Sequence, residues 1–93
     1  MTVNSNTDNI KNGTYKVYAY SDKNYNNLLV SATKSEWENG VEITYNNLQQ
    51  NATIYFRGQT GTDRWGNATF DYNAPKDSRT ITQILSGTNI NIG

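Results

Sequence analysis

The chain has 93 residues with eight basic and eight acidic side chains, so its formal net charge is zero, and it contains neither cysteine nor histidine. These absences exclude disulfides, thiolate metal sites and the commonest general base. Because there is no basic excess to neutralise phosphates and no apolar run of membrane-spanning length, we expect no nucleic-acid partner and no membrane insertion. We also expect no cofactor. The length predicts one domain over residues 1–93, with a core built largely from aromatic residues.

The first two segments of the chain differ in how well they can be buried. Residues 1–11 have Val3 and Ile10 as apolar anchors among polar residues, which predicts a loose leader or a short edge strand. Residues 14–20 alternate in the manner of a strand, and both faces carry packable side chains. We therefore expect a central strand, with one face formed by Tyr15, Val17 and Ala19 and the other by Tyr18 and Tyr20.

The polar segment 21–27 predicts a turn, because Asp and Asn bond their own backbone and tolerate the left-handed region. Its start also matches the D-x-N-x-N pattern of a calcium loop. The sixth position of that pattern is Asn27 instead of glycine, and the twelfth is Thr33 instead of glutamate. We therefore favour an ordinary Asx turn over a metal site, for which the candidate ligands would be Asp22, Asn24 and Asn26.

Residues 28–37 and 41–45 are predicted to form a hairpin around the turn 38–40. A three-residue loop with Gly40 in the left-handed region pairs Trp37 with Val41, whereas a two-residue turn mixes charged residues into the apolar row. We prefer the three-residue loop. No segment of the chain has the periodicity or the length that would predict a helix.

The clearest pattern is a hairpin of strands 52–60 and 68–73 joined by the glycine-bearing loop 61–67. Alternation places Ile54 and Phe56 on the inner face of the first strand. The matching inner row of the second strand is Ala68, Phe70 and Tyr72. The remaining chain is expected to cover this hairpin.

The same hairpin carries a family resemblance. The run Ile54-Tyr55-Phe56-Arg57, followed by Thr62-Asp63-Arg64-Trp65-Gly66-Asn67-Ala68-Thr69, resembles the last hairpin of bacterial immunoglobulin-like and fibronectin-III-like domains. The resemblance covers about a quarter of the chain and rests on turn chemistry. It implies an all-β fold, an immunoglobulin-like antiparallel β-sandwich of seven or eight strands. A jelly-roll-like carbohydrate-binding module is the structural alternative.

Two further strands are predicted after the single proline, Pro75, breaks the hairpin strand. Residues 79–85 are rich in β-formers, although their facing is undetermined. Residues 89–92 alternate cleanly, so the end of the chain, residues 86–93, is expected to be loose or to contact a neighbouring subunit.

The two tryptophans are candidate ligand-binding residues, because exposed aromatic rings on sandwich loops stack on sugar rings. Trp65 lies at the tip of the hairpin, where an indole is hard to bury, and Trp37 lies beside the 38–40 turn. Either residue could instead fill the core or cover a sheet end. The polar side chains expected to accompany a binding tryptophan are Arg64, Asp63, Asn67 and Tyr55.

The sequence favours a non-catalytic function. Glu36, Glu38 and Glu42 surround Trp37, but on adjacent strands of a small domain they are expected to form a solvated rim and not a catalytic pair. We expect an extracellular, cell-surface or virion module of a bacterial or phage protein that attaches to a host surface or glycan. The alternative is a structural spacer, decoration or assembly domain whose edge strands 3–6 and 89–92 pair with protein neighbours.

Overall fold

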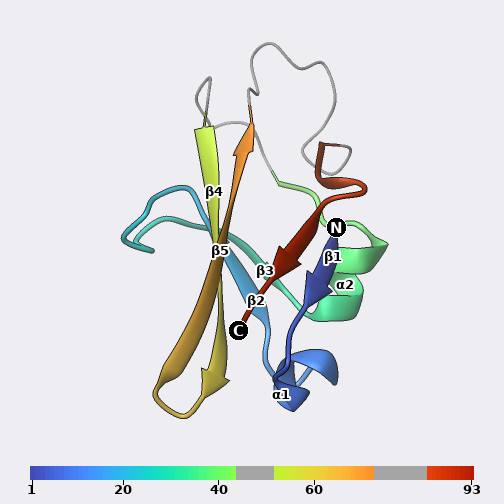
Figure 1. Cartoon of the computed structure of the whole chain (residues 1–93). Coiled ribbons are helices and arrows are strands. Elements are labelled where there is room, and N and C mark those ends of the chain that lie inside the picture. The colour runs from blue at the N-terminus through green and yellow to red at the C-terminus, as the bar shows by residue number, and fades with distance from the viewer. Residues whose placement is uncertain (44–51, 73–83) are drawn as a thin grey trace.

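The computed structural model describes residues 1–43, 52–72 and 84–93. Over these ranges the chain is strand-rich, and its elements are β1 (Thr2–Asn4), α1 (Asp8–Lys11), β2 (Val17–Tyr20), β3 (Leu28–Ala32), α2 (Lys34–Asn39), β4 (Ala52–Gly61), β5 (Arg64–Tyr72) and β6 (Asn89–Asn91). They form two layers, with a four-stranded sheet on one side and both helices, β1 and β6 on the other (Figure 1). No helix in these ranges is long and apolar enough to cross a membrane.

The four-stranded sheet is antiparallel, with the strand order β3-β2-β4-β5. The hairpin expected from the sequence is confirmed as β4 and β5, and its register pairs Ile54 with Phe70 and Phe56 with Ala68. These pairs place the predicted inner rows on one face, where Ile54 and Phe56 are fully buried. The connection is shorter than expected, because β5 begins at Arg64 and not after residue 67.

The predicted central strand is also confirmed, as β2 lies between β3 and β4. Val17 and Ala19 are fully buried on its inner face, whereas Tyr18 and Tyr20 are half-buried on the opposite face. This difference defines two sides of the sheet. The inner side faces the second layer, and the outer side carries the tyrosines.

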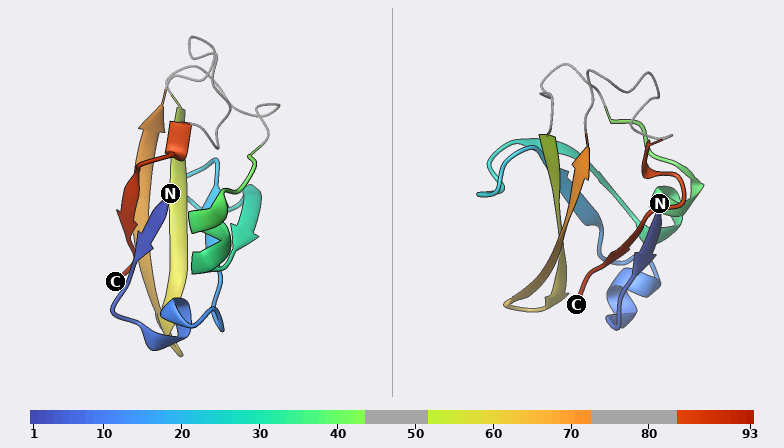
Figure 2. Two further views of the ribbon diagram at one scale, coloured as in Figure 1. Left: turned by 90° about the vertical axis from the view of Figure 1, so that its right-hand side faces the viewer. Right: turned by 45° about the horizontal axis from the view of Figure 1, so that its top comes forward.

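The second layer contains a two-stranded parallel sheet in which β1 pairs with β6. Val3 lies opposite Ile90, and both side chains are buried. The predicted edges 1–11 and 86–93 are therefore not loose, because each supplies a strand to the other. Figure 2 shows the two strands side by side, in front of the hairpin in its left view and next to α1 in its right view.

The chain end rests in a notch of the hairpin made by two glycines that pair with each other, Gly58 and Gly66. A Cβ on Gly58 would lie 3.1 Å from Cγ2 of Ile92 and 3.2 Å from Cδ1 of Ile10. A Cβ on Gly66 would lie 2.7 Å from the backbone nitrogen of Gly93. The missing side chains thus leave the space in which α1 and the C-terminal residues contact the sheet.

The expected hairpin around residues 38–40 is wrong, because residues 34–39 form the helix α2. The cause is a capping box. The Glu36 N–H donates to the Thr33 hydroxyl at 3.3 Å, and the Thr33 N–H donates to the Glu36 carboxylate at 2.9 Å. These bonds satisfy donors that a short helix otherwise leaves unpaired, and Gly40 ends the helix with a positive φ of 106°.

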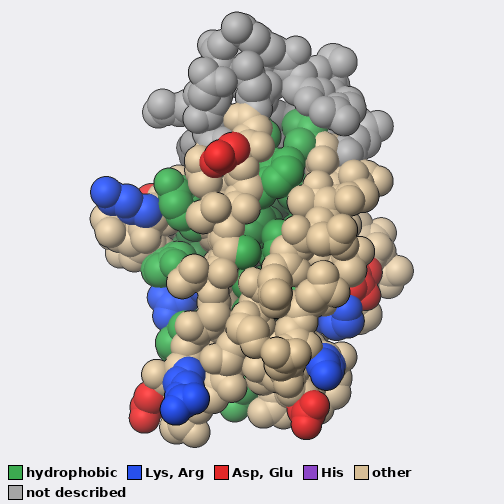
Figure 3. Space-filling model, in the orientation of Figure 1, with side chains coloured by type: hydrophobic (Ala, Val, Ile, Leu, Met, Phe, Trp, Pro, Cys, Tyr) green, Lys and Arg blue, Asp and Glu red, His purple; other side chains and the backbone are tan. Residues whose placement is uncertain are grey.

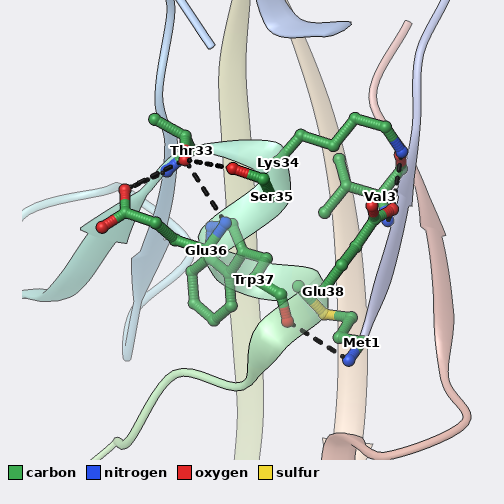
Figure 4. A network of polar contacts seen from close by, with 8 residues as sticks. All are labelled: Met1, Val3, Thr33, Lys34, Ser35, Glu36, Trp37 and Glu38. Carbon is green, nitrogen blue, oxygen red and sulfur yellow. Dashed lines mark hydrogen bonds and ion pairs between the residues drawn. The ribbon is translucent and has the colours of Figure 1, made fainter. Parts of the chain in front are cut away.

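A polar network attaches α2 to β1 (Figure 4). The Lys34 ammonium donates to the Glu38 carboxylate at 2.6 Å and to the Val3 carbonyl oxygen at 2.6 Å. The Glu38 carboxylate in turn accepts from the Val3 N–H at 3.2 Å. These contacts hold the pKa of Glu38 below its ordinary value, chiefly through the hydrogen bond from Lys34. The Glu38 carboxylate therefore has a structural role, because it joins Lys34 of α2 to the backbone of β1.

Trp37 is the largest fully buried side chain among the described residues. Its ring packs edge-on against Phe56, with centroids 5.5 Å apart, and its Nε1 donates to the Val17 carbonyl oxygen at 3.1 Å. The ring thus fills the space between α2 and the inner face of the sheet. Its polar atom is satisfied there, as a buried indole requires.

The remaining strand predictions have mixed outcomes. Val41–Ile43 is not a strand, and residues 44–45 of that prediction lie outside the described ranges. Of the predicted strand 79–85, residues 79–83 also lie outside them. Ile84 and Leu85 are helical instead of extended, and both are buried in the core.

Candidate ligand-binding face

The outer side of the four-stranded sheet carries a continuous series of stacked side chains. Tyr18 stacks on Tyr20 with centroids 6.5 Å apart, and Tyr20 meets Tyr25 edge-on at 5.2 Å. The Arg57 guanidinium lies 4.5 Å from the Tyr25 ring centroid and 4.0 Å from that of Trp65. We call this series the aromatic row: Tyr18, Tyr20, Tyr25, Arg57 and Trp65.

The register of the sheet explains why these residues meet. Tyr18 lies opposite Arg57 on the neighbouring strand, and Gln59, two residues further along β4, lies opposite Trp65. Side chains two apart on a strand share a face, and directly opposed pairs have Cβ atoms about 5 Å apart. The row therefore crosses β2, β4 and β5 as a direct result of the strand pairing.

Tyr25 joins the row from the loop between β2 and β3, which projects to the left in Figure 1. The Asp22 carboxylate accepts from the Asn27 N–H at 2.7 Å and from the Asn26 N–H at 2.9 Å. These bonds close the loop while Tyr25 adopts a left-handed φ of 58°. The polar turn expected from the sequence is thus present, closed by the Asp22 side chain four and five residues on, and it positions Tyr25 over Arg57.

A hollow of about 310 Å³ adjoins the aromatic row and is bordered by both Tyr18 and Trp65. Its lining combines three aromatic side chains with hydroxyl, amide and ammonium groups, contributed by Thr14, Tyr15, Lys16, Tyr18, Ser31, Gln59 and Trp65. A volume near 300 Å³ is at the small end of ligand sites. Figure 3 shows hydrophobic and basic side chains alternating down the left flank of the molecule, below the place where the Tyr25 loop projects in Figure 1.

The structure separates the predicted site residues into two groups. Trp65 is 45% exposed, and Tyr55 and Asn67 share the outer face with it by strand alternation. Asp63 lies in the turn and Arg64 begins β5 with the opposite facing, so neither belongs to the aromatic row. The prediction that Trp37 is a ligand-binding residue is corrected by the structure, because this side chain is 1% exposed and fills the core.

The candidate calcium ligands lie in the loop between β2 and β3. The Asp22 carboxylate already accepts two backbone N–H groups, and both Asn24 and Asn26 are exposed. Among residues 1–43, 52–72 and 84–93, there is no group of three or more acidic residues that could hold a metal ion. The motif instead closes the loop that carries Tyr25.

Several residues of the face were missed by the sequence analysis, namely Lys16, Tyr25, Arg57 and Gln59. The signal for two of them is present in the sequence, because alternation places Arg57 and Gln59 on the same face as Tyr55. Tyr25 has no comparable signal, since its position depends on the fold of a loop. Lys16 precedes β2, and its place in the hollow depends on the approach of β3 and β5.

The loop that holds Tyr25 is expected to respond to acid. Hydrogen bonds from backbone N–H groups, that of Asn27 foremost, hold the pKa of Asp22 below its ordinary value. A lowered pKa in the folded state means that the stabilisation is present above the ordinary pKa and is lost as the pH falls through the lowered one. The Asn27 amide resonance should therefore titrate in NMR spectra with a midpoint below the ordinary pKa of aspartate.

The matched variant for this titration is Asp22→Asn, which keeps an acceptor oxygen but removes the titrating group. Its Asn27 amide shift should be independent of pH in the same range. A wild-type midpoint at or above the ordinary value, or the same titration in the variant, would show that Asp22 does not hold the loop in solution.

Comparisons of this chain with protein-family models, with curated proteins and with solved structures found no match.

Proposed function

We propose that this domain is a non-catalytic glycan-binding module, and that the aromatic row and the adjoining hollow form its binding face. The observation that carries the proposal is the exposed indole of Trp65, which borders a hollow lined by hydroxyl and amide groups. Sugar rings present C–H surfaces that pack on aromatic rings, and hydroxyl groups that require polar partners around them. The face offers both kinds of contact within one small area.

Rigidity of the face supports this proposal. Arg57 stacks on one face of Trp65 and on Tyr25, so these side chains have lost part of their freedom before a ligand arrives. A binding site that is already ordered loses less conformational entropy on binding. The aromatic row should therefore act as a preformed platform, with the remaining surface of Trp65 available to a sugar.

The carboxylates near the face support a binding role over a catalytic one. Glu36 is held in the capping box of α2, where its hydrogen bonds to Thr33 lower its pKa. Asp71 accepts from the Thr53 hydroxyl at 2.6 Å. Acid and base catalysis requires titrating groups directed together at a substrate, and these two groups already have structural partners.

The wider context follows from the same proposal. The module would belong to an extracellular, cell-surface or virion protein of bacterial or phage type, and would attach it to a host surface. The antiparallel hairpin that carries the resemblance supports the immunoglobulin-like or jelly-roll-like architecture of seven or eight strands, whereas the second layer of the described residues contains two helices and a parallel strand pair. The residues described here establish the coarser strand-rich fold.

A structural or assembly domain is the alternative function. In this alternative, strands 3–6 and 89–92 pair with neighbouring chains. These strands pair with each other within the domain, and they bury Val3, Ile90 and Ile92, so the alternative has less support than the exposed aromatic face. The oligomeric mass that this alternative predicts can be measured by light scattering on the intact chain. Deleting residues 87–93 is a poorer test, because it would also remove core side chains.

The proposal predicts that Trp65→Ala folds but loses glycan binding. We expect roughly a tenfold or larger loss of affinity, because aromatic residues at the centre of a binding site commonly contribute more than about 1.4 kcal/mol. The measurement is binding of the labelled domain to an array of neutral and acidic glycans. Circular dichroism and a thermal melt would establish that the variant is folded.

Leu28→Ala is the matched control for this experiment. Leu28 is exposed to a similar extent, at 50%, and lies opposite Tyr20 on β3, the edge strand on the other side of the sheet from Trp65, outside the lining of the hollow. It should bind as the parent does. Equal losses in the two variants would indicate nonspecific hydrophobic adsorption, and an array without any bound glycan would refute the proposed function.

A further inference from the structure

The charge of the binding face differs from that of the whole chain. The chain is neutral overall, but the side chains that line the hollow include the cation Lys16 and no carboxylate. Lys16 is exposed, so its ammonium can reach a ligand. The hollow is therefore locally cationic.

Arg57 adds a second positive charge beside the hollow. Its guanidinium lies against Trp65, and its neighbours Tyr18 and Gln59 both contribute to the lining. The ion pair found among the described residues is Lys34–Glu38. No described carboxylate therefore forms an ion pair with Arg57. Its Nε is buried without a hydrogen-bond partner in the described part of the chain. A guanidinium stacked between two rings keeps its charge and has its N–H edge fixed in direction.

The acidic groups nearest the face offset these two cations only in part. Asp71 lies opposite Thr53, four residues along β4 from Arg57, which is about 13 Å at 3.3 Å per residue. This separation exceeds the screening length of about 8 Å at physiological ionic strength. The carboxylate of Asp22 accepts from backbone N–H groups, and that of Glu36 accepts from Thr33 and also attracts Lys16. Neither carboxylate lines the hollow, and Asp63 is exposed in the hairpin turn.

We infer that the glycan recognised by this face carries an anionic group, a carboxylate or a sulfate or phosphate ester, which binds between Lys16 and Arg57 while a sugar ring packs on Trp65. This inference rests on the proposed function and names its ligand class. The anionic group would satisfy the cations of the hollow, and the ring would use the exposed indole. Charge-assisted hydrogen bonds of this kind are roughly twice as strong as neutral ones.

The test uses three polymers on affinity gels or by calorimetry: polygalacturonate, its fully methyl-esterified form, and dextran sulfate. The methyl ester keeps the sugar ring and removes the charge, so it isolates the anionic contribution. We expect the parent domain to bind polygalacturonate, dextran sulfate or both at least about fivefold more tightly than the ester. Which acidic polymer binds better distinguishes a carboxylate from a sulfate-type ligand.

Lys16→Gln is the diagnostic variant, and Lys11→Gln is its matched control. Lys16→Gln should weaken acidic-polymer binding about three- to tenfold without changing binding to the ester, because the variant removes only a charge contact. Lys11 is exposed at the end of α1 in the second layer, so its substitution makes the same change in net charge away from the face and should leave binding unchanged.

The outcomes separate the inference from the proposed function. Equal, Trp65-dependent binding to the acid and its ester would overturn the inference and leave the glycan-binding function standing. Binding to acidic polymers that Lys11→Gln weakens as much as Lys16→Gln would show unspecific charge attraction and also overturn it. Acid-selective binding unaffected by Trp65→Ala would overturn both, since a glycan-binding face requires the ring.

Discussion

Replacing Trp37 with alanine is expected to destabilise the domain by about 3–5 kcal/mol, the range for deleting a buried aromatic side chain. The ring is 1% exposed and packs against Phe56, so its removal leaves a cavity between α2 and the sheet. The Val17 carbonyl oxygen would also lose its hydrogen bond from the indole. A chain of this length is stabilised by only about 5–14 kcal/mol, so much of the variant should be unfolded under mild denaturing conditions.

Urea unfolding followed by far-ultraviolet circular dichroism measures this effect. Trp37→Phe separates its two causes, because it keeps a ring against Phe56 but removes the N–H donor, and should cost about 1–3 kcal/mol. Trp65→Ala is the control, since its exposed ring contributes mainly the contact with Arg57, worth about 1 kcal/mol. A loss of less than about 1 kcal/mol in Trp37→Ala would contradict the placement of this residue in the core.

Gly66→Ala is expected to have the second largest effect, about 2–3 kcal/mol, which corresponds to a melting temperature lowered by roughly 10 °C or more. The new Cβ would lie 2.7 Å from the Gly93 nitrogen and 3.1 Å from the Ile92 carbonyl carbon. Both are backbone atoms, so no side-chain rotation relieves the overlap. The C-terminal residues would have to move, and the buried side chain of Ile92 would lose its contacts with the hairpin.

The matched control is Gly61→Ala, the same change in the same hairpin. A Cβ there would meet only the Arg64 side chain, at an ordinary contact distance of 3.5 Å. Its stability should stay within about 1 kcal/mol of the parent, because alanine also reduces the freedom of the unfolded chain. Differential scanning calorimetry measures the melting temperatures of both variants. Equal melting temperatures would show that the C-terminal residues do not rest on Gly66.

The hairpin and the central strand could be predicted because their signals are local. Alternation in residues 52–60 and 68–73 identified which side chains face inward, and the structure pairs those same residues. The helix α2 was missed because Leu28 to Trp37 is rich in apolar and β-forming residues, which favoured one long strand. The sequence Thr33-Lys34-Ser35-Glu36 contained the opposing signal, a capping box that ends β3 and starts a helix.

The candidate binding face was predictable only in part. Trp65 was identified because an indole at a hairpin tip is hard to bury, and it is indeed exposed. Trp37 has the same side chain but is buried, because its helix turns the ring toward Phe56. The contact between Tyr25 and Arg57 joins a loop to a distant strand, and no local pattern in the sequence specifies that distance.

The parallel pairing of β1 with β6 sets the order in which the molecule can mature during synthesis. Val3 and its partner Ile90 are far apart in the sequence, so this pair can close only around a long loop, and such non-local contacts form slowly. A ribosome-bound chain would hold Val3, Ile10 and the glycine notch uncovered until residue 92 had emerged from the exit tunnel. These surfaces are therefore the last parts of the domain to be protected from chaperones and from aggregation.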